Sequence, residues 1–154
     1  MYDLDELYQQ VVMEHSRHPR NLKKLDSANR SADGFNPFCG DKITLYLEVD
    51  EQDVIKDVGI DATGCAISKA SASMMTEAIK GNTTDEAREI FNAFRHLLTS
   101  PSGEKVDAEL LGDLEFLGGV VHYPVRIKCA TLSWHTLSAA LDGQQPGDQM
   151  VVAE

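Results

Sequence analysis

The sequence lacks any apolar run that approaches the ~18 residues of a membrane-spanning helix. It also lacks an excess of basic residues, because 25 Asp and Glu against 14 Lys and Arg give a formal net charge of -11. Such an average surface repels both a phosphate backbone and an anionic membrane. We therefore predict a protein that binds neither nucleic acid nor membrane.

We expect neither a secretory leader nor a disulfide framework. The acidic N-terminus, residues 1–6, does not have the basic and then apolar layout of a leader, so we expect a cytoplasmic protein. The three cysteines are Cys39, Cys65 and Cys129, an odd number that cannot form a closed set of disulfides. In a reducing compartment they are expected as thiols or metal ligands, or alternatively as small buried apolar side chains.

The length and composition are typical of one globular domain. The chain has 154 residues, of which 42% are hydrophobic and 25% are charged. We predict a single domain over residues 1–154, with residues 1–2 and about 144–154 frayed.

The hydrophobic pattern predicts an α+β fold. A helical stripe begins at Leu4 and ends before Pro19, and a polar run to about residue 37 is predicted to be irregular, with His15 and His18 solvated. Alternating apolar residues over 43–49 and 58–62 predict an antiparallel hairpin. Helical patterns follow over 67–80, 83–98, 106–117 (ended by two glycines) and 124–141. The expected architecture is a small antiparallel sheet packed against several helices.

Each cysteine lies at the boundary of a predicted element, so three distant segments are able to bring thiols to one end of the sheet. Asp41 follows Cys39 by two residues and adds a carboxylate. Three thiolates and one carboxylate form a set of four ligands that tetrahedral zinc accepts. Arg126 and Lys128 flank Cys129 and supply positive charge. The usual CxxC pairs are absent, so spacing alone leaves a metal site and buried structural cysteines both open.

The local motifs carry more information than the spacing. They are Asn36-Pro-Phe-Cys-Gly-Asp41, then Gly64-Cys-Ala-Ile-Ser68, and then Arg126-Ile-Lys-Cys-Ala130. Together they strongly resemble the U-type iron–sulfur cluster assembly proteins, over most of the chain. Lys128 stands where the IscU-type scaffolds have a histidine, and their Leu-Pro-Pro-Val-Lys motif is absent. The chain is therefore more similar to the SufU branch.

This resemblance implies a zinc-dependent sulfurtransferase that has no stand-alone turnover. It implies zinc ligands at Cys39, Asp41, Cys65 and Cys129, with Cys39 as the sulfur acceptor, and we expect Arg126 to offset the negative charge of the site. The implied partners are a SufS-type cysteine desulfurase, which donates persulfide sulfur, and the SufB–SufC–SufD complex, which receives it.

Two alternatives use the same four residues. The first is a scaffold on which a [2Fe–2S] cluster is assembled before transfer, because thiolates also bind iron–sulfur centres. The second is a globular domain with a structural zinc and no sulfur chemistry.

Overall fold

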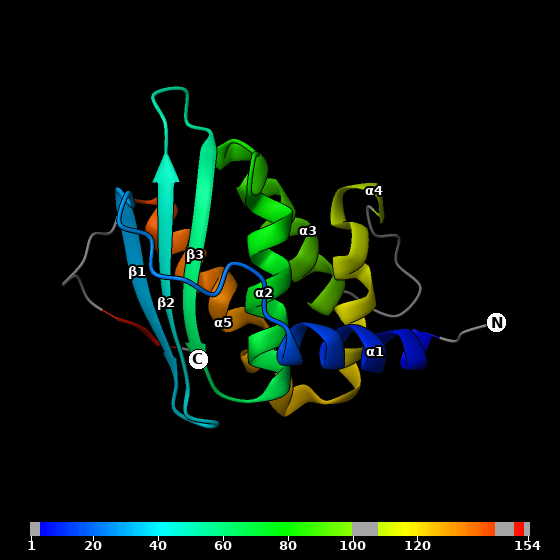
Figure 1. The fold of residues 1–154 in the computed structure, drawn as a ribbon. Coiled ribbons are helices and arrows are strands. Elements are labelled where there is room, and N and C mark those ends of the chain that lie inside the picture. Colours follow the sequence, from blue (N-terminus) through cyan, green and yellow to red (C-terminus); the bar gives the residue numbers. More distant parts are fainter. Residues whose placement is uncertain (1–3, 100–107, 144–149, 153–154) are drawn as a thin grey trace.

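The computed structural model describes residues 4–99, 108–143 and 150–152. The elements are α1 (Leu4–Arg17), β1 (Arg30–Asn36), β2 (Asp41–Val49), β3 (Ile55–Thr63), α2 (Ala66–Ile79), α3 (Thr84–Thr99), α4 (Ala108–Leu111), the 3₁₀ helix η1 (Gly112–His122), α5 (Pro124–Leu141) and β4 (Val151–Val152). Figure 1 shows the sheet on one side of the molecule and the helices on the other. This arrangement confirms the predicted α+β class. None of the described helices has the length and apolarity needed to cross a membrane.

The sheet is built around the predicted hairpin. Its strand order is β3-β2-β1-β4, in which β2 pairs antiparallel with both neighbours and β4 pairs parallel with β1. Side chains on β2 alternate between buried and less buried, as the sequence predicts. The Asp50 carboxylate closes the turn by accepting the backbone N–H groups of Gln52 and Val54, each at 2.9 Å. The sheet is mixed rather than purely antiparallel because of β4.

Strand β1 lies in the run that we expected to be irregular, so that expectation is wrong for residues 30–36. The buried residues of β1 include Ser31, Ala32 and Gly34, which are too small or polar to give apolar alternation. A Cβ atom on Gly34 would collide with the side chain of Thr136 on α5. Close packing of the helix therefore requires the small residue that hides the strand in the sequence.

The predicted helix over 106–117 is also wrong in its extent. Residues 106–107 lie outside the described residues, α4 has only four residues, and the chain continues as η1 through Gly118 and Gly119. A Cβ atom on Gly119 would lie 2.7 Å from the ring of Tyr8 on α1. The glycine therefore allows close contact with α1 and does not end the element.

Two residues near the C-terminus form the short strand β4. Val151 and Val152 pair with Gly34 and Phe35 of β1, so the expectation of a frayed tail is wrong there. The rest of the predicted frayed segments, at 144–149, 153–154 and the first residues, lies outside the described residues.

The other four predicted helices are confirmed as α1, α2, α3 and α5. Thr83 and Glu86 form the predicted capping box of α3, with reciprocal bonds of 2.9 and 3.1 Å. The predicted stripe of α3 is buried, at Ala87, Ile90, Phe91, Phe94 and Leu98. Trp134 of α5 is fully buried against Phe91 and Phe94, with ring centroids 5.8 and 5.1 Å away. These aromatic contacts join α5 to α3 and help to fix the helix that carries Cys129.

His15 is buried, which contradicts the expectation of a solvated side chain, whereas His18 is exposed. The His15 Nδ1 atom lies 2.8 Å from the Ser73 hydroxyl on α2, and this hydroxyl also accepts the Arg20 N–H at 2.8 Å. Burial is the largest cause that lowers the pKa of His15, followed by the charge of Arg20. Three carboxylates act in the opposite direction and raise this pKa, first Glu77 and then Glu14 and Asp113.

This lowered pKa predicts an acid-sensitive fold. Because the unfolded state keeps the ordinary pKa near 6.5, it binds the proton more readily than the folded state. The free energy of unfolding should therefore fall as the pH drops through 6.5 and level off below the folded-state pKa. Urea titrations at several pH values should show this loss in the parent and a smaller loss in His15→Gln. An equal loss in both proteins would contradict the assignment.

Candidate metal centre

Cys39 lies on the tight turn between β1 and β2. The turn is closed by the Gly40 N–H, which donates to the Asn36 carbonyl at 2.9 Å, and Gly40 has a φ of +70°. A residue other than glycine rarely adopts this φ, so the turn depends on Gly40. The Cys39 thiol is only partly buried, and the neighbouring Phe38 is 69% exposed. The turn therefore presents the thiol close to the protein surface.

Asp41 is the first residue of β2, and its carboxylate is completely buried. One oxygen, Oδ1, accepts the backbone N–H of Cys65 at 2.9 Å, and the other, Oδ2, accepts the Asn36 side-chain amide at 3.0 Å. A Cβ atom on Gly64 would collide with the same carboxylate, and Gly64 has a φ of +140°. A glycine before Cys65 is therefore required for the approach of Asp41 to this backbone.

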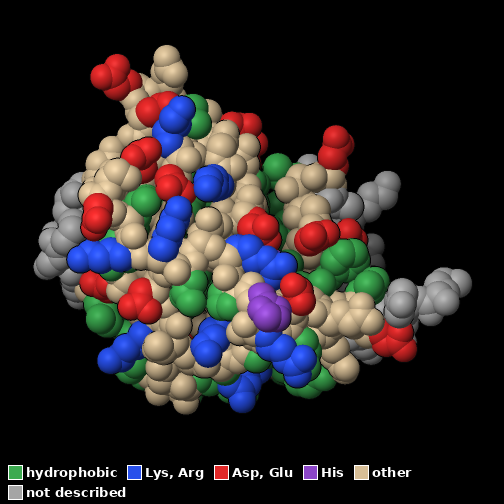
Figure 2. All heavy atoms as spheres, in the orientation of Figure 1, with side chains coloured by type: hydrophobic (Ala, Val, Ile, Leu, Met, Phe, Trp, Pro, Cys, Tyr) green, Lys and Arg blue, Asp and Glu red, His purple; other side chains and the backbone are tan. Residues whose placement is uncertain are grey.

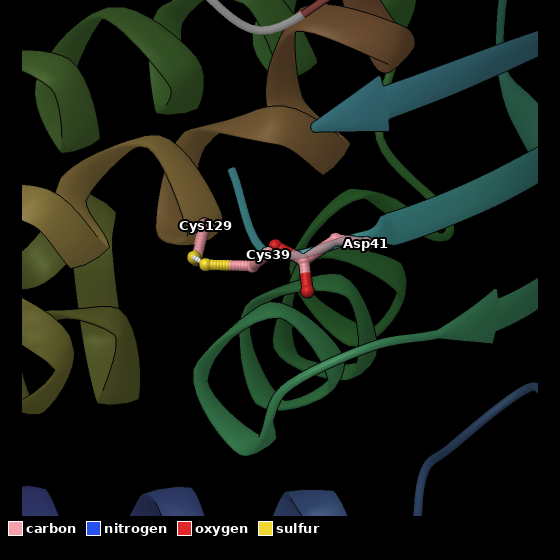
Figure 3. A group of neighbouring side chains, drawn as sticks. All are labelled: Cys39, Asp41 and Cys129. Carbon is pink, nitrogen blue, oxygen red and sulfur yellow. Dashed lines mark hydrogen bonds between the residues drawn. The ribbon is translucent and has the colours of Figure 1, made fainter. Parts of the chain in front are cut away.

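Cys129 comes from the second turn of α5 and is 1% exposed. Its thiol lies 3.3 Å from the Cys39 sulfur and 3.4 Å from the Asn36 amide nitrogen. The ligand atoms of Cys39, Asp41 and Cys129 all lie within 4.8 Å of one another, and Figure 3 shows the two sulfur atoms facing each other beside the carboxylate. Three of the four predicted ligands thus come together from two separate parts of the chain.

Cys65 is positioned differently. It is the N-cap of α2, and its sulfur accepts the Ser68 backbone N–H at 3.4 Å. Its sulfur is not in the set of described ligand atoms that lie within 4.8 Å of one another, although its backbone is bound to Asp41. The main chain of Cys65 is thus bound to Asp41, and its thiol is near enough to the cluster to help raise the pKa of Cys129.

The electrostatics of the cluster favour a bound cation. Burial is the largest cause that raises the pKa of the Cys129 thiol, and the hydrogen bonds to Cys39 and Asp41 raise it further. Arg126 donates to the Cys39 sulfur at 3.1 Å, and the surrounding thiols raise the pKa of its guanidinium. A single guanidinium at the edge does not offset several buried acidic groups, so a divalent cation would stabilise their charged forms.

The donor set matches zinc. Zinc binds thiolate sulfur at ~2.3 Å in tetrahedral geometry, so two sulfurs on one ion are about 3.8 Å apart. The Cys39 and Cys129 sulfurs are 3.3 Å apart, within about half an ångström of that separation. Thiolates also suit iron–sulfur centres, so the donor set alone does not choose between the two.

Asn36 is a site residue that the sequence reasoning did not single out. It is completely buried, it donates to both Asp41 and Cys129, and its side-chain oxygen accepts the Phe38 N–H at 3.2 Å. One amide thus organises the carboxylate, a thiol and the turn. The one sequence feature that points to Asn36 is its position at the start of the first motif, three residues before Cys39.

The comparison with known protein families gives one match to most of the chain. Residues 7–130 match the family described as the NifU-like N terminal domain. The matched segment includes Cys39, Asp41, Cys65 and Cys129.

Individual relatives span nearly the whole chain. The zinc-dependent sulfurtransferase SufU of Bacillus subtilis (strain 168) is 42% identical over 147 residues, which cover 95% of this chain and 97% of that protein. The iron–sulfur cluster assembly scaffold protein IscU of Streptococcus pyogenes serotype M1 is 40% identical and covers 90% of this chain and 84% of that protein.

A solved structure of a protein with a similar assignment also matches this chain. It is a protein from the thermophile Fervidobacterium islandicum AW-1, assigned as an iron–sulfur cluster assembly scaffold for the SUF system. It superposes with a TM-score of 0.80 at 36% identity and covers 88% of this chain and 96% of that one.

The role of Asn36 is testable by truncation. Asn36→Ala leaves the buried Asp41 carboxylate and the Cys129 thiol without their shared donor, so we expect the free energy of unfolding to fall by about 1–3 kcal/mol. The matched control is Asn92→Ala, because Asn92 is exposed and its side chain accepts from the exposed Arg95. Denaturant unfolding measures both, and equal effects would refute the role of Asn36.

Proposed function

The chain belongs to the family of NifU-like N-terminal domains, which act in iron–sulfur cluster assembly, and we propose that it is a zinc-dependent sulfur acceptor within that family. In this proposal it takes persulfide sulfur from a cysteine desulfurase on Cys39. The likeness to SufU of Bacillus subtilis, which is named a zinc-dependent sulfurtransferase, supports this role.

The observation that carries the proposal is the contrast between the two clustered thiols. Cys129 is 1% exposed, whereas Cys39 lies on a surface turn beside an exposed phenylalanine and is only partly buried. An incoming persulfide therefore has access to Cys39 and is shielded from Cys129. Arg126 donates to the Cys39 sulfur at 3.1 Å and so places a positive charge beside the proposed acceptor atom.

The transfer step is a thiol–persulfide exchange. The Cys39 thiolate attacks the outer sulfur of the desulfurase persulfide and forms a new S–S bond on Cys39. The S–S bond of the donor breaks at the same time, and its electron pair stays on the donor cysteine, which leaves as a thiolate. No external oxidant or reductant is needed, because the sulfane sulfur passes unchanged from one thiolate to another.

Zinc would be held by Cys39, Asp41 and Cys129, with Cys65 as the fourth ligand. When bound, it would supply positive charge that keeps the thiols deprotonated. The Asn36 amide and the Cys65 backbone N–H orient the Asp41 carboxylate, each by one hydrogen bond of about 3 Å. Such outer hydrogen bonds typically fix the orientation of metal ligands.

The protein would act with its partners rather than alone. We propose a SufS-type cysteine desulfurase as donor and the SufB–SufC–SufD complex as the recipient, and we expect no turnover without the donor. A cytoplasmic location and the absence of nucleic-acid and membrane partners stay predictions from charge and sequence.

A cluster scaffold is the second candidate, and the likeness to proteins named as assembly scaffolds supports it. In that case the same cysteines and Asp41 would hold a [2Fe–2S] cluster before its transfer. Reconstitution with iron and sulfide under anaerobic conditions, followed by transfer to an apo-ferredoxin, would distinguish this function.

Replacement of Cys39 tests the sulfur acceptor. We expect Cys39→Ser to reduce alanine production by the desulfurase to its basal rate, because serine has no sulfur to receive the persulfide. Mass spectrometry of the parent should find the added sulfur on Cys39. Full stimulation by Cys39→Ser would remove this role, and no stimulation by the zinc-loaded parent would favour the scaffold.

Removal of zinc tests the metal site. A ligand that binds only the folded state at ~1,000 times its dissociation constant stabilises it by about 4 kcal/mol. Chelation should then lower the melting temperature by about 10 °C for a chain of this size. Readdition of zinc should restore it. A melting temperature that does not move on verified loss of the metal would contradict zinc binding at this site.

A further inference from the structure

A mostly apolar groove of about 800 Å³ lies beside the candidate metal centre. Tyr8 and Met13 of α1 form one wall, Ile67 at the start of α2 forms another, and Tyr123 and Arg126 at the start of α5 complete it. Met13 and Tyr123 are 45% and 53% exposed. An apolar depression of this size on an otherwise charged surface is typical of a binding site.

The rim of the groove is basic although the whole chain is acidic. Arg17, His18 and Arg126 line it, and the one acidic lining residue, Glu14, is paired with Arg20 at 3.1 Å. Figure 2 shows lysine and arginine side chains over much of the face, several of them in its lower part. In a protein of net charge -11, this local reversal favours a ligand that carries negative charge.

The wall of the groove also contains a hydroxyl group without a partner. Tyr8 is 7% exposed, and its hydroxyl makes no hydrogen bond within the described part of the chain. Its ring stacks on Tyr123 with centroids 6.3 Å apart. Burial, followed by the effect of Tyr123, raises the pKa of the Tyr8 phenol to about 12, so the group is an O–H donor. An unsatisfied buried donor is uncommon in folded proteins, and this one belongs to a residue that lines the groove.

The groove is continuous with the proposed sulfur acceptor through Arg126. This residue lines the groove, and its Nη1 atom lies 3.1 Å from the Cys39 sulfur. A segment bound in the groove would therefore place the rest of its protein directly over Cys39.

We propose that this groove is the docking surface for the sulfur-donating protein, and that it binds a segment of that protein with apolar side chains and a carboxylate. This inference rests on the function proposed above. The apolar side chains would pack against Met13, Ile67 and Tyr123, and the carboxylate would meet Arg17 and Arg126. Contact with Arg126 would place the bound segment beside the side chain that donates to the Cys39 sulfur.

A charge placed in the groove tests the proposal. Met13→Glu puts a carboxylate against the expected apolar and acidic ligand, so affinity for the cognate cysteine desulfurase should fall at least tenfold. The matched control is Leu22→Glu, because Leu22 is 53% exposed, lies outside the groove and gives the same change in net charge. Biolayer interferometry gives the dissociation constants, and the concentration for half-maximal alanine production should shift equally. The rate at saturation and the zinc content should match the parent.

A second pair of variants tests the basic rim. Arg17→Glu should weaken desulfurase binding, and the effect should shrink as salt is raised. Lys24→Glu, on an exposed residue outside the groove, should have a smaller effect. Equal affinities of Arg17→Glu and Lys24→Glu, or of Met13→Glu and Leu22→Glu, would overturn the docking site.

The outcomes separate this inference from the proposed function. A parent that binds the desulfurase without accepting sulfur would overturn the sulfur-acceptor function, while the affinities of the variants would still decide the groove. Sulfur transfer in the parent with no selective loss in Met13→Glu would keep the function and overturn the groove. A parent with no affinity for the desulfurase would overturn both. Loss of self-association in Met13→Glu, seen by sedimentation velocity, would identify a second copy as the occupant and overturn the proposal.

Discussion

The buried carboxylate of Asp41 is the constraint on which the site depends. A fully buried carboxylate is costly unless its oxygens are satisfied, and here each oxygen accepts one bond, from the Cys65 backbone and from the Asn36 amide. These two bonds tie the start of β2 to the end of β1 and to the segment that joins β3 to α2. Because Asn36 also reaches the Cys129 sulfur at 3.4 Å, α5 is included in the same network. The carboxylate therefore defines where the chain segments that carry the cysteines meet.

The hydrophobic core holds the other half of the site in place. α5 packs on β1 where Gly34 leaves room for Thr136, and Trp134 lies between α5 and α3. Between α2 and α5, the Ser71 hydroxyl donates to the Ala130 carbonyl and accepts the Trp134 indole N–H at 3.2 Å. Ala130 follows Cys129 directly, so these core contacts help to fix the position of the Cys129 thiol. The small buried residues of α2 allow α2 and α5 to pack closely together.

The sequence predicts those parts of the molecule in which one local pattern determines the structure. The hairpin, the Thr83–Glu86 capping box and the stripe of α3 follow from periodicity and capping, and the proximity of Cys39, Asp41 and Cys129 agrees with the motifs. Strand β1 was not predictable, because its small buried residues are explained only by a helix a hundred residues away. The burial of His15 likewise depends on Ser73, which is 58 residues distant. The Cys65 sulfur accepts the Ser68 N–H at the start of α2, a contact that motif spacing does not specify.

The separation of the two clustered thiols along the chain affects when the cluster forms during folding. Cys39 and Cys129 are 90 residues apart, and α5 is the last helix of the described chain. Contacts over such a separation form late, because closing a long loop costs entropy before the contact is gained. A ribosome-bound chain whose α5 has not yet been synthesised contains Cys39 and Asp41 but not Cys129. Assembly of the thiol pair thus marks the completion of folding, and a half-made chain does not present the finished cluster to metal ions or sulfur donors.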